Sequence, residues 1–389
     1  MKLLRTLLFF PSLTFNIFNA EIFPWAFIYG VIKSKHIGYR LFFIILLMLG
    51  SFIFTSIFHN GIFFLDSVRS MFAYLNPLII FFVLIKINLQ KTIFFRNLIN
   101  KIFIFLIVVG LLQSTGIFSF ISEYIVYLIP RSSFANFSKI HGVSLLSTEP
   151  SRAAIELIFI YAFIRSANNL KRTNKFLLDL FMFIFLVIII KSMVGLVLYL
   201  ILNFMYYKLK VLIPILTLVV ITSTINIDSR ALILFQQIIS EISFVDVYNI
   251  FLNAAGTRVV SVLSAYSDGL TSLFGNGVGT WSVSSVNAMI NIGYDPKEIS
   301  FFVKHSNSEF VGIRPSAYFA NIALDFGIIG MVIYIISFIN IFKKYYKNRV
   351  TKHLLYLFLF SFFFIGATGN PVPWVLLAIS MRYTDFYFK

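Results

Sequence analysis

A short polar cluster near the middle of the chain is the part of the sequence best suited to chemistry. Thr148-Glu149-Pro150-Ser151-Arg152 leads directly into an apolar stretch that carries one further acid, Glu156. Each acid or base at the centre of a bilayer costs about 2.5–3.5 kcal/mol on insertion scales, so such groups are usually paired, hydrated or functional. Glu149, Arg152 and Glu156 stand at positions i, i+3 and i+7 and would share one face of a helix. The cluster therefore indicates chemistry at a membrane surface.

Glu149 has two interpretations that the sequence leaves open. In the structural one, Pro150 occupies the first turn of a helix and Thr148 or Glu149 caps the free N–H groups of that turn. In the functional one, Glu149 is a general base whose pKa is set jointly by Arg152 and by burial. A further alternative to a general base is that Glu149, Arg152 and Glu156 neutralise one another along the helix and have only a structural role.

The composition determines the class of protein. Hydrophobic residues make up 59% of the 389 residues and charged residues only 12%, whereas soluble domains are about 45–50% apolar. The net charge of +17 does not indicate nucleic-acid binding, because the positive residues lie between apolar runs rather than along one face. The chain has no cysteine, which excludes disulfides, zinc–thiolate sites and thiol nucleophiles. We expect an all-α polytopic membrane protein embedded in a lipid bilayer.

The apolar runs predict about 11–12 transmembrane helices. Residues 6–32 form one long span or, interrupted by Pro11 and Pro24, a tight hairpin that acts as an uncleaved anchor. The further runs long enough to span lie near 41–58, 67–85, 102–117, 150–165, 176–190, 193–207, 211–226, 317–342, 354–368 and 371–383.

The positive residues predict the orientation of these helices. Eighteen of the 32 lysines and arginines fall in alternate loops, which the positive-inside rule places in the cytoplasm. They are Lys33, Lys35, Arg40, Lys86, Lys91, Arg96, Lys101, Arg165, Lys171, Arg172, Lys175, Lys208, Lys210, Lys343, Lys344, Lys347, Arg349 and Lys352. A single helix over 176–207 would place the last five of these residues, from Lys343 to Lys352, on the outer side of the membrane. We therefore predict two helices separated at Lys191-Ser192. Both termini are then cytoplasmic if the N-terminal segment is a hairpin.

Two outer loops are too long to be simple turns, and long ordered loops tend to carry function. They divide the chain into 1–227, N-terminal helices with an outer loop near 118–149; 228–316, a large loop expected in the periplasm; and 317–389, C-terminal helices. The large loop contains an amphipathic stretch from Leu232 to Phe251.

Three arginines of the large loop, Arg230, Arg258 and Arg314, are candidates for binding phosphate oxygens, because a guanidinium grips them in a bidentate fork. The alternative for each is an ordinary solvated arginine. His305 is a candidate base or ligand, but no second histidine or clustered carboxylate stands at metal-ligand spacing, so we predict no metal site.

Gly275-Asn276-Gly277-Val278-Gly279 resembles a nucleotide-binding loop only superficially. No strand–glycine–helix unit surrounds it, so we interpret it as a flexible hinge. Asp-x-Asp, which commonly holds the metal of enzymes that use nucleotide sugars, is absent from the sequence. If the protein transfers a sugar, the donor need not be a nucleotide, and no cofactor is predicted.

The chain resembles bacterial O-antigen and capsule repeat-unit polymerases of the Wzy type, within the O-antigen ligase/polymerase superfamily. The resemblance rests on four features: the layout of spans, the helix entry at Glu149-Pro150-Ser151, the stretch from Gly256-Thr257-Arg258 to Gly279, and the segment from Ser316 to Gly330. In the family, this last segment closes the large periplasmic loop and begins the next helix. Ligase-like members often have a histidine followed by asparagine where this chain has Ser316-Ala317, which favours a polymerase over a ligase.

The resemblance implies a metal-independent glycosyl transfer on the periplasmic face of the bacterial inner membrane, likewise without a cofactor. The donor is a growing glycan on polyprenyl pyrophosphate, and the acceptor is a sugar hydroxyl of the next lipid-linked repeat unit. We assign the pyrophosphate to Arg258, with Arg314 and Arg152 as helpers, and the base to Glu149 with a pKa raised by partial burial. Arg230 and His305 are further candidates for substrate binding. Direct displacement with one base would invert the anomeric carbon.

Two other functions remain open from the sequence. One is an O-antigen ligase that transfers finished glycan to a lipid A core sugar. The other is a transporter of lipid-linked oligosaccharide, which should show internal repeats and charges on several mid-membrane helices. A polymerase would also involve a chain-length regulator and a flippase as partners.

Overall fold

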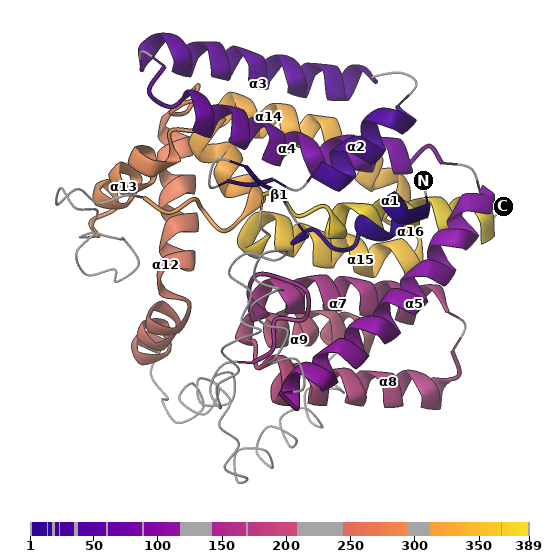
Figure 1. The fold of residues 1–389 in the computed structure, drawn as a ribbon. Helices are drawn as coiled ribbons and strands as arrows, with labels where there is room; N and C mark the ends of the chain where they lie inside the picture. The colour runs from indigo at the N-terminus through magenta and orange to yellow at the C-terminus, as the bar shows by residue number, and fades with distance from the viewer. Residues whose placement is uncertain are drawn as a thin grey trace.

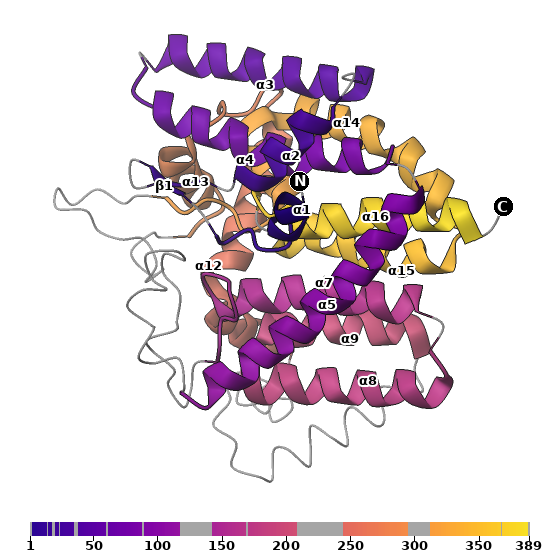
Figure 2. The same cartoon turned by 45° about the vertical axis from the view of Figure 1, so that its right-hand side comes forward.

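The computed structural model is a bundle of helices with one small β-hairpin (Figure 1). It describes residues 2–13, 15–17, 20–22, 24–34, 38–59, 61–87, 89–116, 142–168, 170–207, 244–294, 312–366 and 368–387. Most of the helices run roughly side by side, and both termini lie at the same end of the bundle (Figures 1 and 2). The opposite end carries the 244–294 segment, which falls in the predicted large outer loop.

Five helices of the described chain are long and apolar enough to cross a membrane. They are α3 (Tyr39–Phe58), α4 (Phe64–Leu84), the Thr92–Ser114 part of α5 (Leu89–Ser114), α8 (Arg172–Ile184) continued by the π-helical η2 (Phe185–Ile190), and α14 (Tyr318–Tyr345). Three shorter apolar helices accompany them: α9 (Met193–Tyr207), α15 (Arg349–Phe360) continued by η4 (Ser361–Ile365), and α16 (Val372–Tyr387). These helices fit the predicted multi-pass α-helical membrane protein. The predicted span at 211–226 lies outside the described residues.

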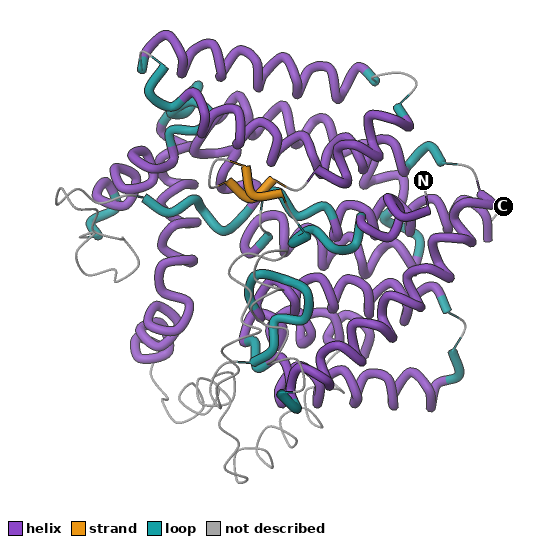
Figure 3. The backbone as a smooth tube through the Cα atoms, viewed as in Figure 1, coloured by secondary structure: helices purple, strands orange, loops and turns teal. Residues whose placement is uncertain are grey.

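The N-terminal segment is a hairpin and not one long span. Helix α1 (Lys2–Leu7) is followed by strands β1 (Phe15–Ile17) and β2 (Ala20–Ile22), which pair antiparallel, and by α2 (Pro24–Lys33), which returns against α1. Figure 3 shows how small a part of the described chain these strands are. Ten helical residues extend only about 15 Å, half of the hydrocarbon core, so α2 is too short to span.

Helix α7 (Pro150–Ala167) is the interior helix of the bundle. Fourteen of its 18 residues are buried, against four of 20 in α3, whose apolar side chains face outward. It packs against α5, α9, α15 and α16, with α5 crossing obliquely in front of it in Figure 2. A helix that is buried on every side by other helices forms the core of a bundle.

The predicted break between two helices at Lys191-Ser192 is confirmed. The π-helical segment η2 ends at Ile190, and Lys191 adopts a left-handed conformation with φ 52° before α9 begins at Met193. A non-glycine residue with positive φ stops a helix, so the chain reverses there.

Helix α14 is interrupted at Gly327, whose φ is 59°. In an unbroken helix, the N–H groups of Ile328 and Ile329 would donate to the carbonyls of Leu324 and Asp325. The kink leaves these four backbone groups without helical partners, and buried backbone groups must find others.

The glycine-rich segment between α12 (Phe244–Thr271) and α13 (Trp281–Asn291) supplies the missing partners. The carbonyls of Ser272 and Leu273 accept from Ile328 and Ile329 at 3.0 and 3.2 Å, and the N–H groups of Asn276 and Gly277 donate to Leu324 and Asp325 at 2.9 and 3.0 Å. Thus residues 272–277 replace the broken helical bonds of α14 one for one.

Glycine is required at three positions of this segment. Gly275, Gly277 and Gly279 have φ of 69°, 91° and 92°, and a Cβ at any of them would lie within 2.6 Å of Asp325, Thr55 or Ser67, respectively. The segment is therefore wedged against α3, α4 and α14. It has a packing role and is not the flexible hinge expected from sequence.

Candidate functional site

The predicted helix entry is present, but its polar side chains do not cap it. Glu149 is the N-cap residue of α7, with Pro150 following in the first turn, and no side chain caps the helix. The structural interpretation, in which Thr148 or Glu149 caps the helix, is therefore wrong. Ser151 instead donates a hydrogen bond to Glu149 Oε2 at 2.9 Å, and the carboxylate is turned toward other partners.

Helix α12 brings Arg258 to Glu149, although the two residues are 109 positions apart. Arg258 Nη2 lies 2.7 Å from Glu149 Oε2, and Arg152 Nε lies 3.8 Å from Glu149 Oε1. The side chains of Glu149 and Arg258 are each 42% exposed, and that of Arg152 is 31% exposed. We call these three residues the outer charge cluster. It unites two residues assigned to catalysis from sequence with one assigned to binding.

The electrostatics of Glu149 are opposite to the prediction. Burial alone would raise the pKa of its carboxyl group, but the guanidinium of Arg258, then that of Arg152, and the Ser151 hydroxyl favour the charged form and hold the pKa below its usual value. The predicted raised pKa is wrong, because the sequence did not show that Arg258 lies in contact.

Glu156 does not join the cluster. It is only 6% exposed, and its two oxygens accept hydrogen bonds from Ser147 at 2.8 Å and Asn370 at 3.2 Å. No cation pairs with it among the described residues. Glu149 and Arg152 therefore lie at the surface while Glu156, expected on the same face, is buried, because other helices enclose α7 within two turns of its start.

Arg314 contacts residues outside the outer charge cluster. Its Nε donates to Asn321 at 3.2 Å, and its guanidinium lies 5.3 Å from the centre of the Tyr74 ring. Two residues further along the chain, the Ser316 hydroxyl lies 3.5 Å from the backbone carbonyl of Arg258, so this segment packs against α12. Arg230 and His305 lie outside the described residues.

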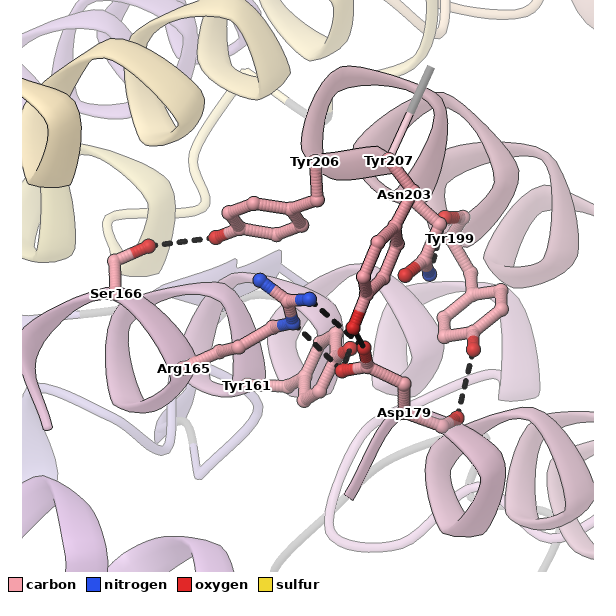
Figure 4. A network of polar contacts seen from close by, with 8 residues as sticks. All are labelled: Tyr161, Arg165, Ser166, Asp179, Tyr199, Asn203, Tyr206 and Tyr207. Atoms are coloured by element: carbon pink, nitrogen blue, oxygen red, sulfur yellow. Dashed lines mark hydrogen bonds and ion pairs between the residues drawn. The ribbon is translucent and has the colours of Figure 1, made fainter. Parts of the chain in front are cut away.

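The opposite end of α7 holds a second arginine–carboxylate pair that sequence reasoning missed. Arg165 binds Asp179 of α8 through two hydrogen bonds, at 2.6 and 2.8 Å, and both side chains are at most 7% exposed. Figure 4 shows the surrounding hydroxyl groups, which with this pair form what we call the inner network: Tyr161, Arg165, Ser166, Asp179, Tyr199, Asn203, Tyr206 and Tyr207. Arg165 was expected in a cytoplasmic loop, which is wrong, because it is buried in the last turn of α7.

Every polar group of Asp179 in the inner network has a partner. Tyr161 and Tyr207 donate to its carboxylate and Tyr199 to its backbone carbonyl, while the Arg165 guanidinium stacks 3.6 Å from the centre of the Tyr206 ring. A charged pair satisfied in this way suits a structural role, whereas the half-exposed outer charge cluster can exchange partners.

The outer charge cluster is best suited to binding an anion. Two guanidinium groups meet one carboxylate, so the cluster carries a net positive charge, and guanidinium groups bind phosphate oxygens in bidentate fashion. Within the described ranges, no three histidine, aspartate or glutamate side chains gather as a metal site would need.

No family model, curated protein or solved structure matches this chain. The functional argument therefore depends on the geometry of the site.

Proposed function

We propose that this protein is a glycosyltransferase that polymerises polyprenyl-pyrophosphate-linked oligosaccharide repeat units on the periplasmic face of the bacterial inner membrane. The observation that carries the proposal is the contact between Arg258 and Glu149 at the entry of an interior helix. An anion site beside an acid suits the pyrophosphate of a lipid carrier, which needs positive charge for the leaving group and a base for the acceptor.

In this proposal the arginines meet the charge of the leaving group. Polyprenyl pyrophosphate departs with its negative charge increasing, and fixed positive groups in a partly dehydrated site stabilise that charge. Arg258 would bind the pyrophosphate, with Arg152 and Arg314 assisting. Neither a metal ion nor a cofactor is needed for this step, because the guanidinium groups supply the positive charge.

Glu149 would act as base only after the donor has bound. The pyrophosphate oxygens compete with Glu149 for Arg258 and Arg152. As these guanidinium groups turn to the phosphate, the carboxylate loses the charges that hold its pKa down, and its affinity for a proton rises. The acceptor hydroxyl then loses its proton to Glu149 as its oxygen attacks the anomeric carbon, with inversion.

The membrane orientation of the proposal follows the charge pattern. The outer charge cluster lies at the end of α7 opposite to the chain termini (Figure 1). If the lysine-rich loops face the cytoplasm, this end faces the periplasm, where a chain-length regulator and a flippase would act beside the enzyme.

The test is the surface-glycan ladder of a deletion strain that carries an empty vector, the wild-type gene, or the gene with Arg258→Ala. The matched control is Arg69→Ala, because Arg69 also pairs with a carboxylate, Asp66, at 3.4 Å and is 46% exposed. We expect single repeat units on core lipid with the vector and with Arg258→Ala, and full ladders with the wild type and Arg69→Ala.

Other outcomes would replace the proposal. Bare core with long glycan left on its lipid carrier would indicate a ligase. A glycan ladder that is unchanged in the deletion strain would show that the protein has no role in glycan assembly. Repeat units trapped on the cytoplasmic face would indicate the transporter.

A further inference from the structure

An apolar groove follows α14 on the side where α15 and its π-helical continuation η4 pack against it. It encloses about 120 Å³, and its lining extends along α14 from Phe319 in the first turn to Phe342 near the last. Ile335 and Ile339, which line one edge, are 46% and 39% exposed, so the groove is open along this edge. Because α14 is long and apolar enough to cross a membrane, we expect the open edge to face bilayer hydrocarbon.

Stacked aromatic rings make the groove rigid. On α14, Phe338 stacks on Phe342 with the ring centroids 5.6 Å apart, and on the facing wall Phe358 stacks on Phe362 at the same distance. Trp374 of α16 lies 5.5 Å from Phe338 and 4.7 Å from Phe358 and so joins the two walls. Each of these rings contacts at least two of the others. Such contacts are favourable beyond the area they bury, so the groove is preformed.

The space suits a hydrocarbon chain. Apolar cavities of about 150 Å³ hold a benzene-sized molecule, so a groove of about 120 Å³ with one open side accommodates several methylene groups of a longer chain. Lipid tails are as apolar as the groove, so burial of a chain does not by itself favour one lipid over another. The charges at the end of the groove decide which lipid binds.

Lys343 lies at the Phe342 end of the groove. It stands four residues after Ile339 and eight after Ile335 on α14, so these three side chains share one face of the helix. Lys343 is therefore about one helical turn beyond the open edge of the groove. Its side chain is exposed, and it forms no ion pair with a carboxylate among the described residues.

Lys352 reaches the same end from the opposite wall. It stands seven residues before Leu359, which lines the groove, so both lie on one face of α15. Its Nζ lies 5.5 Å from the centre of the ring of Tyr346, the C-cap residue of α14, so the two walls meet there. In the part of the chain that the structure describes, Lys352 also lacks a carboxylate partner. Two ammonium groups without counter-ions at the end of an apolar groove complement a lipid with an anionic headgroup.

We propose that this groove binds an anionic phospholipid, with one acyl chain between α14 and α15 and the headgroup phosphate between Lys343 and Lys352. Lysine clusters beside membrane-spanning helices attract anionic lipids, and an ammonium group binds phosphate as a compact charge. Lys344 and Lys347, which are exposed in the same turn, add to the positive potential.

The position of the lysines favours a phospholipid over the lipid carrier of the proposed function. The outer charge cluster lies near the other end of α14, where Ser316 contacts Arg258. The last turn of α14 instead points toward the end of the bundle that holds both chain termini (Figure 2). The bound phospholipid therefore belongs to the leaflet opposite the proposed pyrophosphate site.

The test is the retention of lipid by the purified full-length protein in native mass spectrometry. The probes are phosphatidylglycerol, which is anionic, and phosphatidylethanolamine with the same acyl chains, which has no net charge. Lys343→Gln/Lys352→Gln removes the headgroup contacts. Its control, Lys33→Gln/Lys171→Gln, removes two exposed lysines that lie elsewhere in the chain.

A second variant tests the chain-binding part of the site. Ile339→Trp fills the groove from its open edge. Its control, Ile336→Trp, introduces the same ring at a position of α14 that is 61% exposed and does not line the groove.

We expect the wild type to bind one phosphatidylglycerol more tightly than phosphatidylethanolamine. Lys343→Gln/Lys352→Gln should weaken binding of phosphatidylglycerol about 25-fold, or about fivefold for each lysine, and leave phosphatidylethanolamine unchanged. Ile339→Trp should lose both lipids, because the added ring occupies the space of the acyl chain. Both controls should behave as the wild type.

Four outcomes would overturn the proposal. Equal retention of the two phospholipids by the wild type, or an equal loss in Lys33→Gln/Lys171→Gln, would refute the headgroup site. Unchanged retention in Ile339→Trp would place the lipid outside the groove. Displacement of phosphatidylglycerol by polyprenyl phosphate would assign the groove to the lipid carrier instead. The assay involves no turnover, so none of these results depends on the proposed function.

Discussion

The two ends of α7 use the same pair of groups for opposite purposes. At its N-cap, Glu149 meets Arg258 and Arg152, and about two-fifths of the Glu149 and Arg258 side chains is exposed. In its last turn, Arg165 meets Asp179 with almost no exposure and with tyrosine hydroxyls around the carboxylate. The difference teaches that burial and the number of partners, and not the identity of the pair, decide whether an ion pair holds a fold together or stays available for a ligand.

The largest expected effect is on stability, at the inner network. Arg165→Ala leaves a buried carboxylate without its counter-ion, which typically costs about 3–5 kcal/mol in the free energy of unfolding. Thermal unfolding of the purified protein in detergent measures this. The double variant Arg165→Met/Asp179→Leu should recover part of the loss, because it leaves no bare charge; a double variant worse than either single one would contradict the structural role.

The next effect is on activity, at the outer charge cluster. Arg258→Ala should lower the rate of chain extension about 10²–10³-fold, as for the loss of one donor to a developing oxyanion. Its free energy of unfolding should change by no more than about 0.5 kcal/mol, since the pair is half exposed. Rate and unfolding are measured on the same preparation, with Arg69→Ala as the unaffected control. A large loss of stability in Arg258→Ala would show that the outer ion pair, like the inner one, has a structural role, and would contradict the comparison of the two ends of α7.

A charge swap tests the outer pair in another way. Glu149→Arg combined with Arg258→Glu restores an ion pair between α7 and α12 but moves the base and the anion-binding group. We expect stability within about 1 kcal/mol of the wild type, because repulsion between Arg152 and the introduced guanidinium offsets part of the restored pair. Chain extension should be as low as in Arg258→Ala. An active swapped protein would show that only the salt bridge matters and would remove both catalytic assignments.

The smallest effect concerns pH. A group whose pKa is lower in the folded state stabilises the fold above its unfolded pKa, near 4.5 for Glu149, and loses that contribution as the pH falls through the lower folded value. The difference in stability between wild type and Glu149→Gln should therefore be constant from pH 5 to 8 and shrink only below about 4.5. Arg258, Arg152 and Ser151 are the groups that face this carboxylate. If the stability difference between wild type and Glu149→Gln changed between pH 6 and 7, the pKa of Glu149 would be raised, as expected from sequence.

Sequence reasoning identified most of the framework, because hydropathy and breaker residues act locally. The apolar runs correspond to α3, α4, α7, α14 and their neighbours, and the break at Lys191 follows from charge parity alone. The N-terminal hairpin was one of two options, and Pro11 and Pro24 were its signal. Helix ends were less accurate, since α5 begins at Leu89 and the apolar run was placed at 102.

The site was predictable as a set of residues but not as a geometry. Glu149, Arg152 and Arg258 were named, yet nothing in the chain order predicts a contact over 109 residues. The helical spacing of Glu156 was correct, but which face of α7 the bundle encloses depends on the other helices. A lone aspartate in an apolar helix was a usable signal for Asp179, because such acids need partners.

By itself, the sequence determined that the chain is helical and apolar enough for a membrane protein, roughly where its helices lie, and where the helix before Lys191 ends. These properties follow from local hydrophobicity and backbone stereochemistry, which each segment carries with it. The tertiary structure alone decided that Arg258 lowers the pKa of Glu149, that Arg165 is a buried partner of Asp179, and that residues 272–277 complete the broken α14. Each of these depends on distances and burial between segments far apart in the chain, and electrostatic energy is determined by such distances and by the surrounding dielectric.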